Sequence, residues 1–377
     1  MRGTAVYPAR PVRHHATTPL RIAVVAPPWY ELPPEGYGGI EAVCATLVDQ
    51  LVDNGHDVTV FGVGRRCGTA GRFVSLIAEP QYLRLGEAMP AALYAARVKQ
   101  ALSDGDFDVV HDHSPCGPLT APGRATPTVV TVHGPVDGEL GDYFAALGGC
   151  VWPVAISESQ RRSRTDLHWA ATVHNAVDPG RFAPAPPTGG PVLWLARMCS
   201  DKGPDLAIEA CRKAGLPLVL AGKCNEAAEQ QYLEQVVRPL LHDDVELVLN
   251  ADRPTTARLL ARARCVIVPV RWREPFGMVM VEAMASGRPV VALRRGAVPE
   301  IVRHGVTGWI CDDPAELPDA LHRVGELDPL ACVAHVQLAF SAELMARRYE
   351  AVYRRAVAEG FAKRAFERTT LRPLYST

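Results

Sequence analysis

Two glutamates, with seven residues between them, occur in the segment EPFGMVMVEAMASG, which spans residues 274–287. The segment follows CVIVPV, an apolar run typical of a buried parallel strand. From Phe276 and Gly277 onward, apolar residues recur at helical spacing, so we expect a helix to open here. The N–H groups at such a helix start favour a phosphate. Glu274 would then lie in a ligand crevice and Glu282 two turns along the helix, although each could also be a capping or surface carboxylate.

An arginine and a lysine form a second pattern of chemical interest. Arg197 and Lys202 are five residues apart and directly follow the apolar run VLWLA. A planar guanidinium and a compact ammonium together suit a diphosphate. Surface Arg and Lys are also commonly solvated, so the spacing alone indicates an anion site without naming the anion.

Glycines mark the turn after the first apolar run, RIAVVA. Gly38 and Gly39 would let the backbone approach a diphosphate, with the start of the next helix facing it; a plain loop is the alternative. The later pair Gly62 and Gly64 is not a dinucleotide fingerprint, because Cys67 stands where the third glycine is required.

Histidine and aspartate clusters have plainer interpretations. His133 follows the run PTVVTV, and a loop histidine of this kind is more often structural or solvated. The run HDH at 111–113 has no third ligand in view, so we do not interpret it as a metal site. Asp104, Asp106 and Asp108 lie at a helix-to-strand turn, where Asp and Gly are turn-forming residues.

The pattern E-P-F-G-x-x-x-x-E-A-M-A-S-G resembles the donor-site signature of family 4 retaining glycosyltransferases of the GT-B fold. The resemblance extends from about residue 21 to 360 and includes the R-x-x-x-x-K pair. HNAVDPGRF, residues 174–182, resembles another family segment, with Ala176 where glycine is usual. The strand-end turn AGKCNE departs from the family, because Lys223 and Cys224 replace commoner small residues.

The resemblance implies a role for each candidate. Arg197, Lys202 and the Gly38-Gly39 turn would bind the diphosphate, and Glu282 the ribose hydroxyls. Glu274 would hold the hydroxyls of the sugar, beside the backbone N–H groups of Phe276, Gly277 and Met278. His133 would lie at the reactive face of the sugar, and the turn at 250–254 would read the base through its backbone.

The implied activity is that of a retaining hexosyltransferase. The donor would be a nucleoside-diphosphate sugar of the UDP-glucose or GDP-mannose type, and the acceptor a hydroxyl of a glycan, lipid or small molecule. Two cations and a helix N-terminus can stabilise the departing diphosphate, so we expect no metal and no other cofactor. No nucleophile is obvious on the β-face, which favours same-face substitution assisted by the leaving phosphate. A nucleotide-sugar epimerase on the same fold, and a non-catalytic nucleotide-sugar binder, are the alternatives.

Length and element order indicate the architecture. A chain of 377 residues suits two domains. Strands and helices alternate in both halves, which predicts an α/β protein: two Rossmann-like domains with parallel sheets facing a central cleft. The resemblance to the GT-B fold implies, in addition, a C-terminal helix crossing back to the first domain. The expected segments are a flexible arm at 1–19, an acceptor domain at 20–185, a donor domain at 186–341, and a helix with a basic tail at 342–377.

Composition and charge indicate which partners and which compartment suit the protein. The net charge of −1 argues against a dedicated nucleic-acid binder. No run approaches the roughly 18 apolar residues of a membrane-spanning helix. Isolated cysteines in apolar runs (Cys44, Cys150 and Cys265) should act as small hydrophobes, which suits a reducing cytoplasm. The basic C-terminal end indicates a solvated face, with peripheral contact to the inner face of the membrane as a second interpretation. Its basic residues are Arg347, Arg348, Arg354, Arg355, Lys363, Arg364, Arg368 and Arg372.

Overall fold

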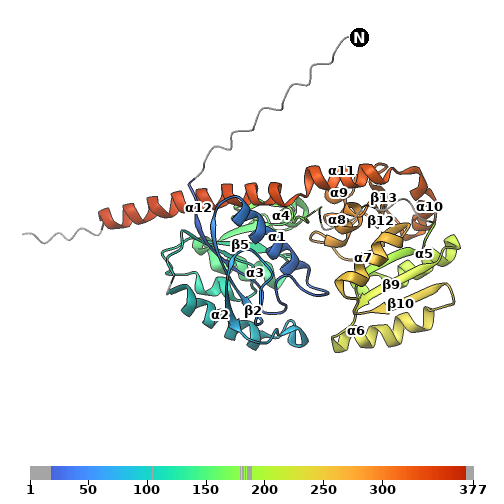
Figure 1. The fold of residues 1–377 in the computed structure, drawn as a ribbon, viewed down its shortest axis with the longest axis horizontal. Coiled ribbons are helices and arrows are strands. Elements are labelled where there is room, and N and C mark those ends of the chain that lie inside the picture. Colours follow the sequence, from blue (N-terminus) through green and yellow to red (C-terminus); the bar gives the residue numbers. More distant parts are fainter. Residues whose placement is uncertain are drawn as a thin grey trace, which may run out of the picture.

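Two parallel sheets, one in each half of the chain, form the framework of the protein (Figure 1). The computed structural model describes residues 18–103, 105–178, 180, 182, 184 and 189–370, with side chains as far as residue 360. The first sheet has seven strands in the order β3-β2-β1-β4-β5-β6-β7, and the second has six in the order β10-β9-β8-β11-β12-β13. The predicted α/β architecture with two Rossmann-like domains is confirmed.

The inner strands of the first sheet are short β-branched runs that are buried on both faces, as parallel sheets require. Its strands are β1 (Arg21–Val25), β2 (Asp57–Val63), β3 (Arg72–Ile77), β4 (Val109–Asp112), β5 (Thr128–Val132), β6 (Trp152–Ala155) and β7 (Ala171–Thr172). Its helices are α1 (Gly39–Asp53), α2 (Ala88–Ser103), α3 (Glu139–Leu147) and α4 (Glu158–Ser163). The strand order reverses between β1 and β4, which is where open α/β sheets bind ligands.

The second sheet repeats this construction and reverses between β8 and β11. Its strands are β8 (Val192–Arg197), β9 (Leu218–Lys223), β10 (Val245–Leu249), β11 (Cys265–Val268), β12 (Val290–Leu293) and β13 (Gly308–Cys311). Its helices are α5 (Pro204–Ala214), α6 (Ala227–Tyr232), α7 (Arg253–Arg262), α8 (Met278–Ala285), α9 (Val298–Ile301), α10 (Leu317–His322) and α11 (Pro329–Ala339). The edge strands β7 and β13 were not predicted, because each is too short or too mixed to give a clear apolar run.

The last helix, α12 (Ala342–Thr370), returns to the first domain, as expected (Figure 1). Tyr349, Val352 and Tyr353 are buried in the same hydrophobic core as β1 and α1. The first domain is therefore completed by the end of the chain.

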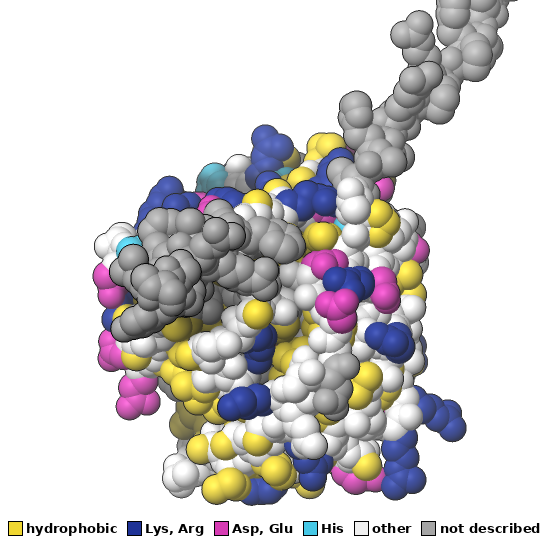
Figure 2. Space-filling view, turned by 90° about the vertical axis from the view of Figure 1, so that its left-hand side faces the viewer, with side chains coloured by type: hydrophobic (Ala, Val, Ile, Leu, Met, Phe, Trp, Pro, Cys, Tyr) yellow, Lys and Arg dark blue, Asp and Glu magenta, His cyan; other side chains and the backbone are white. Residues whose placement is uncertain are grey.

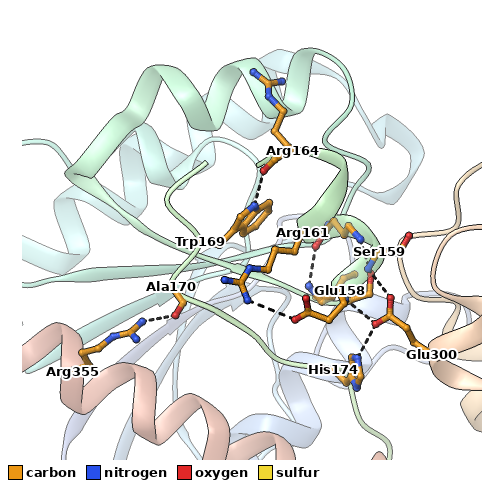
Figure 3. Close-up of polar contacts among 12 residues, drawn as sticks. Glu158, Ser159, Arg161, Arg164, Trp169, Ala170, His174, Glu300 and Arg355 are labelled. Atoms are coloured by element: carbon orange, nitrogen blue, oxygen red, sulfur yellow. Dashed lines mark hydrogen bonds and ion pairs between the residues drawn. The ribbon is translucent and has the colours of Figure 1, made fainter. Parts of the chain in front are cut away.

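A second contact joins the two domains at their boundary (Figure 3). The carboxylate of Glu300, at α9, accepts the backbone N–H groups of Glu158 (2.8 Å) and Ser159 (2.6 Å) at the start of α4. His174, in the segment between the domains, lies 3.2 Å from the same carboxylate. The half-buried carboxylate loses solvation, but these hydrogen bonds outweigh that cost and hold its pKa below its usual value.

Some expectations need correction or lie outside the described residues. Cys150 is exposed rather than buried, because it ends a 3₁₀ turn (Gly148–Cys150) on the surface before β6. Asp106 and Asp108 lie in the expected connection between α2 and β4, and both contact Arg21. Outside the described residues lie Asp104, most of the expected arm, the expected domain boundary at 185–186 and the side chains beyond residue 360.

The surface of the first domain carries basic side chains that are scattered between apolar and uncharged ones on the face shown in Figure 2. In the described part of the chain, no helix is both long enough and apolar enough to cross a membrane.

Candidate functional site

Glu274 lies in the loop after β11 and is 5% exposed. Its backbone is held by the turn before α9, where the N–H of Ala297 donates to the carbonyl oxygen of Glu274 (2.8 Å). Gly296 adopts a φ of 57° there, and a Cβ at this position would lie 2.2 Å from the same oxygen. Only glycine fits so close an approach, so the turn fixes the position of the glutamate.

The two cations predicted to bind a diphosphate, Arg197 and Lys202 (the clamp), lie at the end of β8 and in the turn after it. Arg197 is its last residue and is half-buried, and Lys202 ends the 3₁₀ turn Ser200–Lys202 that follows. Gly203 comes next with a φ of 65°, and a Cβ there would lie 2.3 Å from the carbonyl oxygen of Pro269. The turn after β8 is therefore packed directly against the end of β11, which brings the clamp to Glu274.

Lys202 and Glu274 form an ion pair, with 2.5 Å between Nζ and Oε2. The indole N–H of Trp272 donates to the same oxygen (2.9 Å), and the Lys202 ammonium lies 4.6 Å from the centre of a Trp272 ring. The side chains are 16% and 6% exposed, so water screens the pair weakly. A ligand that carries a phosphate and hydroxyls could replace each partner with its own groups.

Helix α8 begins at Met278, slightly later than predicted, with Gly277 as its N-cap. The φ of Gly277 is 86°, and a Cβ there would lie 2.5 Å from the Met280 side chain. Phe276 is buried against Phe340, with 6.0 Å between the ring centres. The N–H of Met280 donates to the carbonyl oxygen of Gly277 (3.0 Å), and the N–H groups before it lie at the positive end of the helix, where an anion is favoured.

The start of α1 faces the start of α8 across the cleft. Gly38 caps α1 with a φ of 144°, and a Cβ there would lie 2.8 Å from the side chain of Pro34. A Cβ on Gly39 would lie 3.7 Å from the Met278 side chain. Two positive helix ends, one from each domain, therefore point at the same region.

The loop before α1 also contacts the second domain. The carbonyl oxygen of Glu35 accepts the backbone N–H of Arg253 (3.0 Å), next to the turn predicted to read the base. Glu41, in the first turn of α1, is 3% exposed, and its Oε1 has no hydrogen-bond partner among the described residues. Burial raises the pKa of Glu41 to about 8.

Glu282 lies within α8, as predicted. Burial raises the pKa of its carboxyl, and the charge of Arg253 at the start of α7 partly offsets this rise. The charge of Arg253 therefore acts on Glu282, whereas Glu274 is paired with Lys202.

His133 follows β5, and its Nε2 lies 2.9 Å from Nδ1 of His113, which follows β4. Burial lowers the pKa of His133 to about 3, so the ring is neutral near neutral pH. The contact with His113 was not predicted. A hint was present in the sequence, because both histidines follow apolar runs that could be neighbouring strands.

Lys223 was noted only as a departure from the family, yet the structure places it beside the clamp. It is paired in register with Arg197 on the neighbouring strand and is 4% exposed. Its ammonium contacts Glu226, lies 3.1 Å from Glu229, and lies 5.6 Å from the ring centre of Tyr37. A third cation is therefore present at this edge of the sheet, neutralised by two carboxylates.

A pocket between the domains adjoins Glu274. Residues of both domains line it: Pro135, Val136, Asp137, Gln160 and Ser163 from the first domain, and Arg273, Glu274 and Pro275 from the second. The site therefore combines a buried carboxylate, clustered cations and two helix starts at one interdomain cleft. No group of three or more metal-ligating side chains occurs within the described ranges.

Comparison with known proteins identifies the architecture. Residues 37–181 match the family described as Glycosyltransferase Family 4, and residues 183–330 match Glycosyl transferases group 1. The chain is 28% identical to a phosphatidyl-myo-inositol mannosyltransferase of Mycolicibacterium smegmatis, covering 82% of this chain and 86% of that protein. It is 29% identical to a D-inositol 3-phosphate glycosyltransferase of a Nocardioides species, covering 73% of each. The crystal structure of AviGT4, a glycosyltransferase involved in avilamycin A biosynthesis, superposes with a TM-score of 0.69 at 25% identity, covering 90% of this chain and 98% of that one.

Proposed function

We propose that this chain, which belongs to the family 4 glycosyltransferases of the GT-B fold, is a retaining hexosyltransferase using a nucleoside-diphosphate sugar. The observation that carries the proposal is the Lys202–Glu274 pair between two helix starts. It supplies a cation for a phosphate and a carboxylate for sugar hydroxyls within one cleft. Ten free cysteines suit a reducing compartment, so we propose that the reaction takes place in the cytoplasm.

The diphosphate would be bound by Arg197 and Lys202, together with the N-termini of α1 at Gly38-Gly39 and of α8 at Met278. These groups stabilise the negative charge that develops on the leaving diphosphate, and they are already in place before reaction. We therefore propose that no metal is required.

The remaining residues would hold the donor along the cleft. Glu274 would accept hydrogen bonds from the hydroxyls of the hexose, and Glu282 from those of the ribose. His133 would contact the reactive face of the hexose. The base would lie at the turn at 250–254, which leads into α7.

The proposed reaction is a same-face substitution. The bond between the anomeric carbon and the diphosphate oxygen breaks as the acceptor oxygen approaches from the same side. The acceptor proton passes to the departing phosphate oxygen, so the products are a glycoside with retained configuration and a nucleoside diphosphate. The relatives named for mannosyl transfer and for inositol 3-phosphate support a polyol or lipid-linked polyol acceptor.

A lipid-linked acceptor would bring the protein to a membrane surface. The exposed arginines Arg347 and Arg348 of α12 would then contact anionic lipid. Co-sedimentation with anionic but not zwitterionic vesicles, lost on replacing both arginines with Ser, is the expected result.

A donor screen tests the proposed activity. The purified protein is incubated with UDP-, GDP- and ADP-hexoses without acceptor, and release of nucleoside diphosphate is measured. Inositol, inositol phosphate and simple glycosides are then added, and NMR determines the anomeric configuration of the product. An inverted product would contradict retention. Formation of an epimerised nucleotide sugar would indicate an epimerase, and binding without turnover of any donor would indicate a binding protein.

A further inference from the structure

We propose that His113 is a positioning residue that holds the ring of His133 and determines which His133 nitrogen carries the hydrogen. The proposal rests on the proposed function in one respect, because it takes His133 as the ring that faces the sugar.

The contact between the two rings is direct and enclosed. His113 and His133 follow the neighbouring parallel strands β4 and β5. Nδ1 of His113 lies 2.9 Å from Nε2 of His133, and the rings are stacked with 26° between their planes. The side chain of His113 is almost fully buried, and its backbone N–H donates to the carbonyl oxygen of Val25 (2.9 Å). Strand pairing therefore fixes where the ring of His113 can lie.

One of the two facing nitrogens must donate the hydrogen bond. Burial keeps both rings neutral, and a neutral imidazole carries a single N–H. The other nitrogen of His113, Nε2, is buried and has no partner in the described part of the chain. Buried N–H groups without an acceptor are rarer than buried acceptors without a donor. We therefore assign the hydrogen of His113 to Nδ1, from which it is donated to Nε2 of His133.

This assignment has a consequence for the substrate side of His133. Because Nε2 accepts, the hydrogen of His133 lies on Nδ1. That nitrogen makes no hydrogen bond to any residue that the structure describes, and residues 135–137, just beyond it, line the interdomain pocket. His133 is thereby presented as a hydrogen-bond donor to an oxygen of the sugar or of the departing phosphate.

The ring of His111, packed against that of His113, restricts rotation of the His113 side chain. The ring of His111 lies 4.0 Å from that of His113, centre to centre. Both nitrogens of His111 are engaged, Nδ1 by the hydroxyl of Tyr353 and Nε2 by that of Thr131, each at 2.7 Å. Tyr353 belongs to α12, so the returning helix holds His111, which in turn packs against His113.

The first experiment determines the tautomer directly. Imidazole ¹⁵N NMR of the wild-type protein, with the His133 signals assigned from a His133→Gln spectrum, should show His133 protonated at Nδ1. A His133 protonated at Nε2 in the wild type would overturn the proposal. This measurement needs no donor and no activity.

The second experiment uses two variants and a control. His113→Phe keeps a ring but removes the donor, and should lower kcat by about tenfold or more while the donor KM changes less than about twofold. His113→Asn places an amide N–H where Nδ1 was, and should recover kcat to within about threefold of the wild type. Tyr94→Phe removes an equally buried hydrogen bond outside the histidine stack, from the Tyr94 hydroxyl to the carbonyl oxygen of Phe61 (2.9 Å), and should leave kcat unchanged.

The outcomes separate this proposal from the proposed function. Equal loss in the Phe and Asn variants, or wild-type kcat in His113→Phe, would show that His113 does not act through its donor. Wild-type kcat in His133→Ala would instead remove His133 from the proposed sugar site, while the NMR result would still decide whether His113 sets its tautomer.

Discussion

The ammonium of Lys202 and the carboxylate of Glu274 neutralise each other in the cleft, at 2.5 Å and largely shielded from water. The proposed phosphate-binding cation and the proposed sugar-binding carboxylate are thus each other's partner. A donor has to replace both at once, its phosphate taking the place of the carboxylate and its hydroxyls that of the ammonium. A ligand with only one of these groups would leave a buried charge unpaired, which costs several kcal/mol.

Replacing Lys202 with Met should weaken nucleoside-diphosphate binding by roughly 10- to 100-fold, because a charge-assisted hydrogen bond contributes about 1.5–3 kcal/mol. Binding of the nucleoside alone should change less than about twofold. Calorimetry with both ligands measures the two effects. Lys213→Met, which removes an exposed lysine of α5, is the matched control. Equal weakening of both ligands would contradict the clamp assignment.

Replacing Glu274 and replacing Glu282 should change different kinetic parameters. Glu274→Gln removes an acceptor of charge-assisted hydrogen bonds that strengthen as the sugar becomes cationic, so kcat should fall with little change in donor KM. Donor hydrolysis without acceptor should fall in parallel. Steady-state kinetics with a circular dichroism check of folding gives the answer. If the variant hydrolyses the donor at the wild-type rate but transfers the sugar more slowly, Glu274 contacts the acceptor and not the donor sugar.

Glu282→Gln should mainly raise the donor KM, since ribose contacts are equally strong in the ground and transition states. The same kinetic assay measures this. A fall in kcat at constant KM would assign Glu282 to the reacting sugar and reverse the proposed orientation of the donor.

Chelation tests the proposal that no metal takes part. Because Arg197, Lys202 and two helix starts already offer positive charge to the diphosphate, excess EDTA should leave both transfer and hydrolysis unchanged. Activity lost on chelation and restored by magnesium or manganese would show that these groups are insufficient.

Glu41 should make stability depend on pH in an unusual direction. Its pKa is about 8 in the folded protein, against an ordinary value of 4.5 for a solvated glutamate. The folded protein therefore binds the extra proton, and stability falls as pH rises from 4.5 towards 8. Glu41→Gln cannot ionise. The unfolding free energy of this variant, relative to the wild type, should therefore rise by about 3 kcal/mol between about pH 4.5 and 7.

Urea unfolding at both pH values measures the Glu41 effect. Glu209→Gln, at an exposed glutamate of α5, supplies the response of a solvated carboxylate. A relative stability of Glu41→Gln that does not vary with pH would show that the buried carboxyl is ionised in the folded protein.

The strands that position the site could be predicted from sequence, because each is a short β-branched run followed by a turn. The pairing of strands could not. Lys202 and Glu274 meet because β8 and β11 are neighbours, and 72 residues of chain separate them. The contact between His113 and His133 likewise depends on the adjacency of β4 and β5, which no local pattern contains.

Lys223 shows a second limit of prediction from sequence, which concerns burial. Its position in a strand-end turn was visible, but an isolated lysine there gives no sign of burial. Only the packing of α6 shows that Glu226 and Glu229 enclose its ammonium. Likewise, the start of α8 was placed too early, because a helical apolar pattern does not reveal that Gly277 adopts a left-handed cap.

The return of α12 to the first domain constrains the order in which the protein can fold during synthesis. Tyr349 and Tyr353 belong to the core around β1, yet they are translated after every strand of the second domain. On the ribosome, the second sheet can therefore be complete while the first still exposes the apolar surface that these tyrosines cover. The core of the amino-terminal domain is therefore completed only once α12 has been synthesised, and a fragment that ends after β7 would lack part of its own interior.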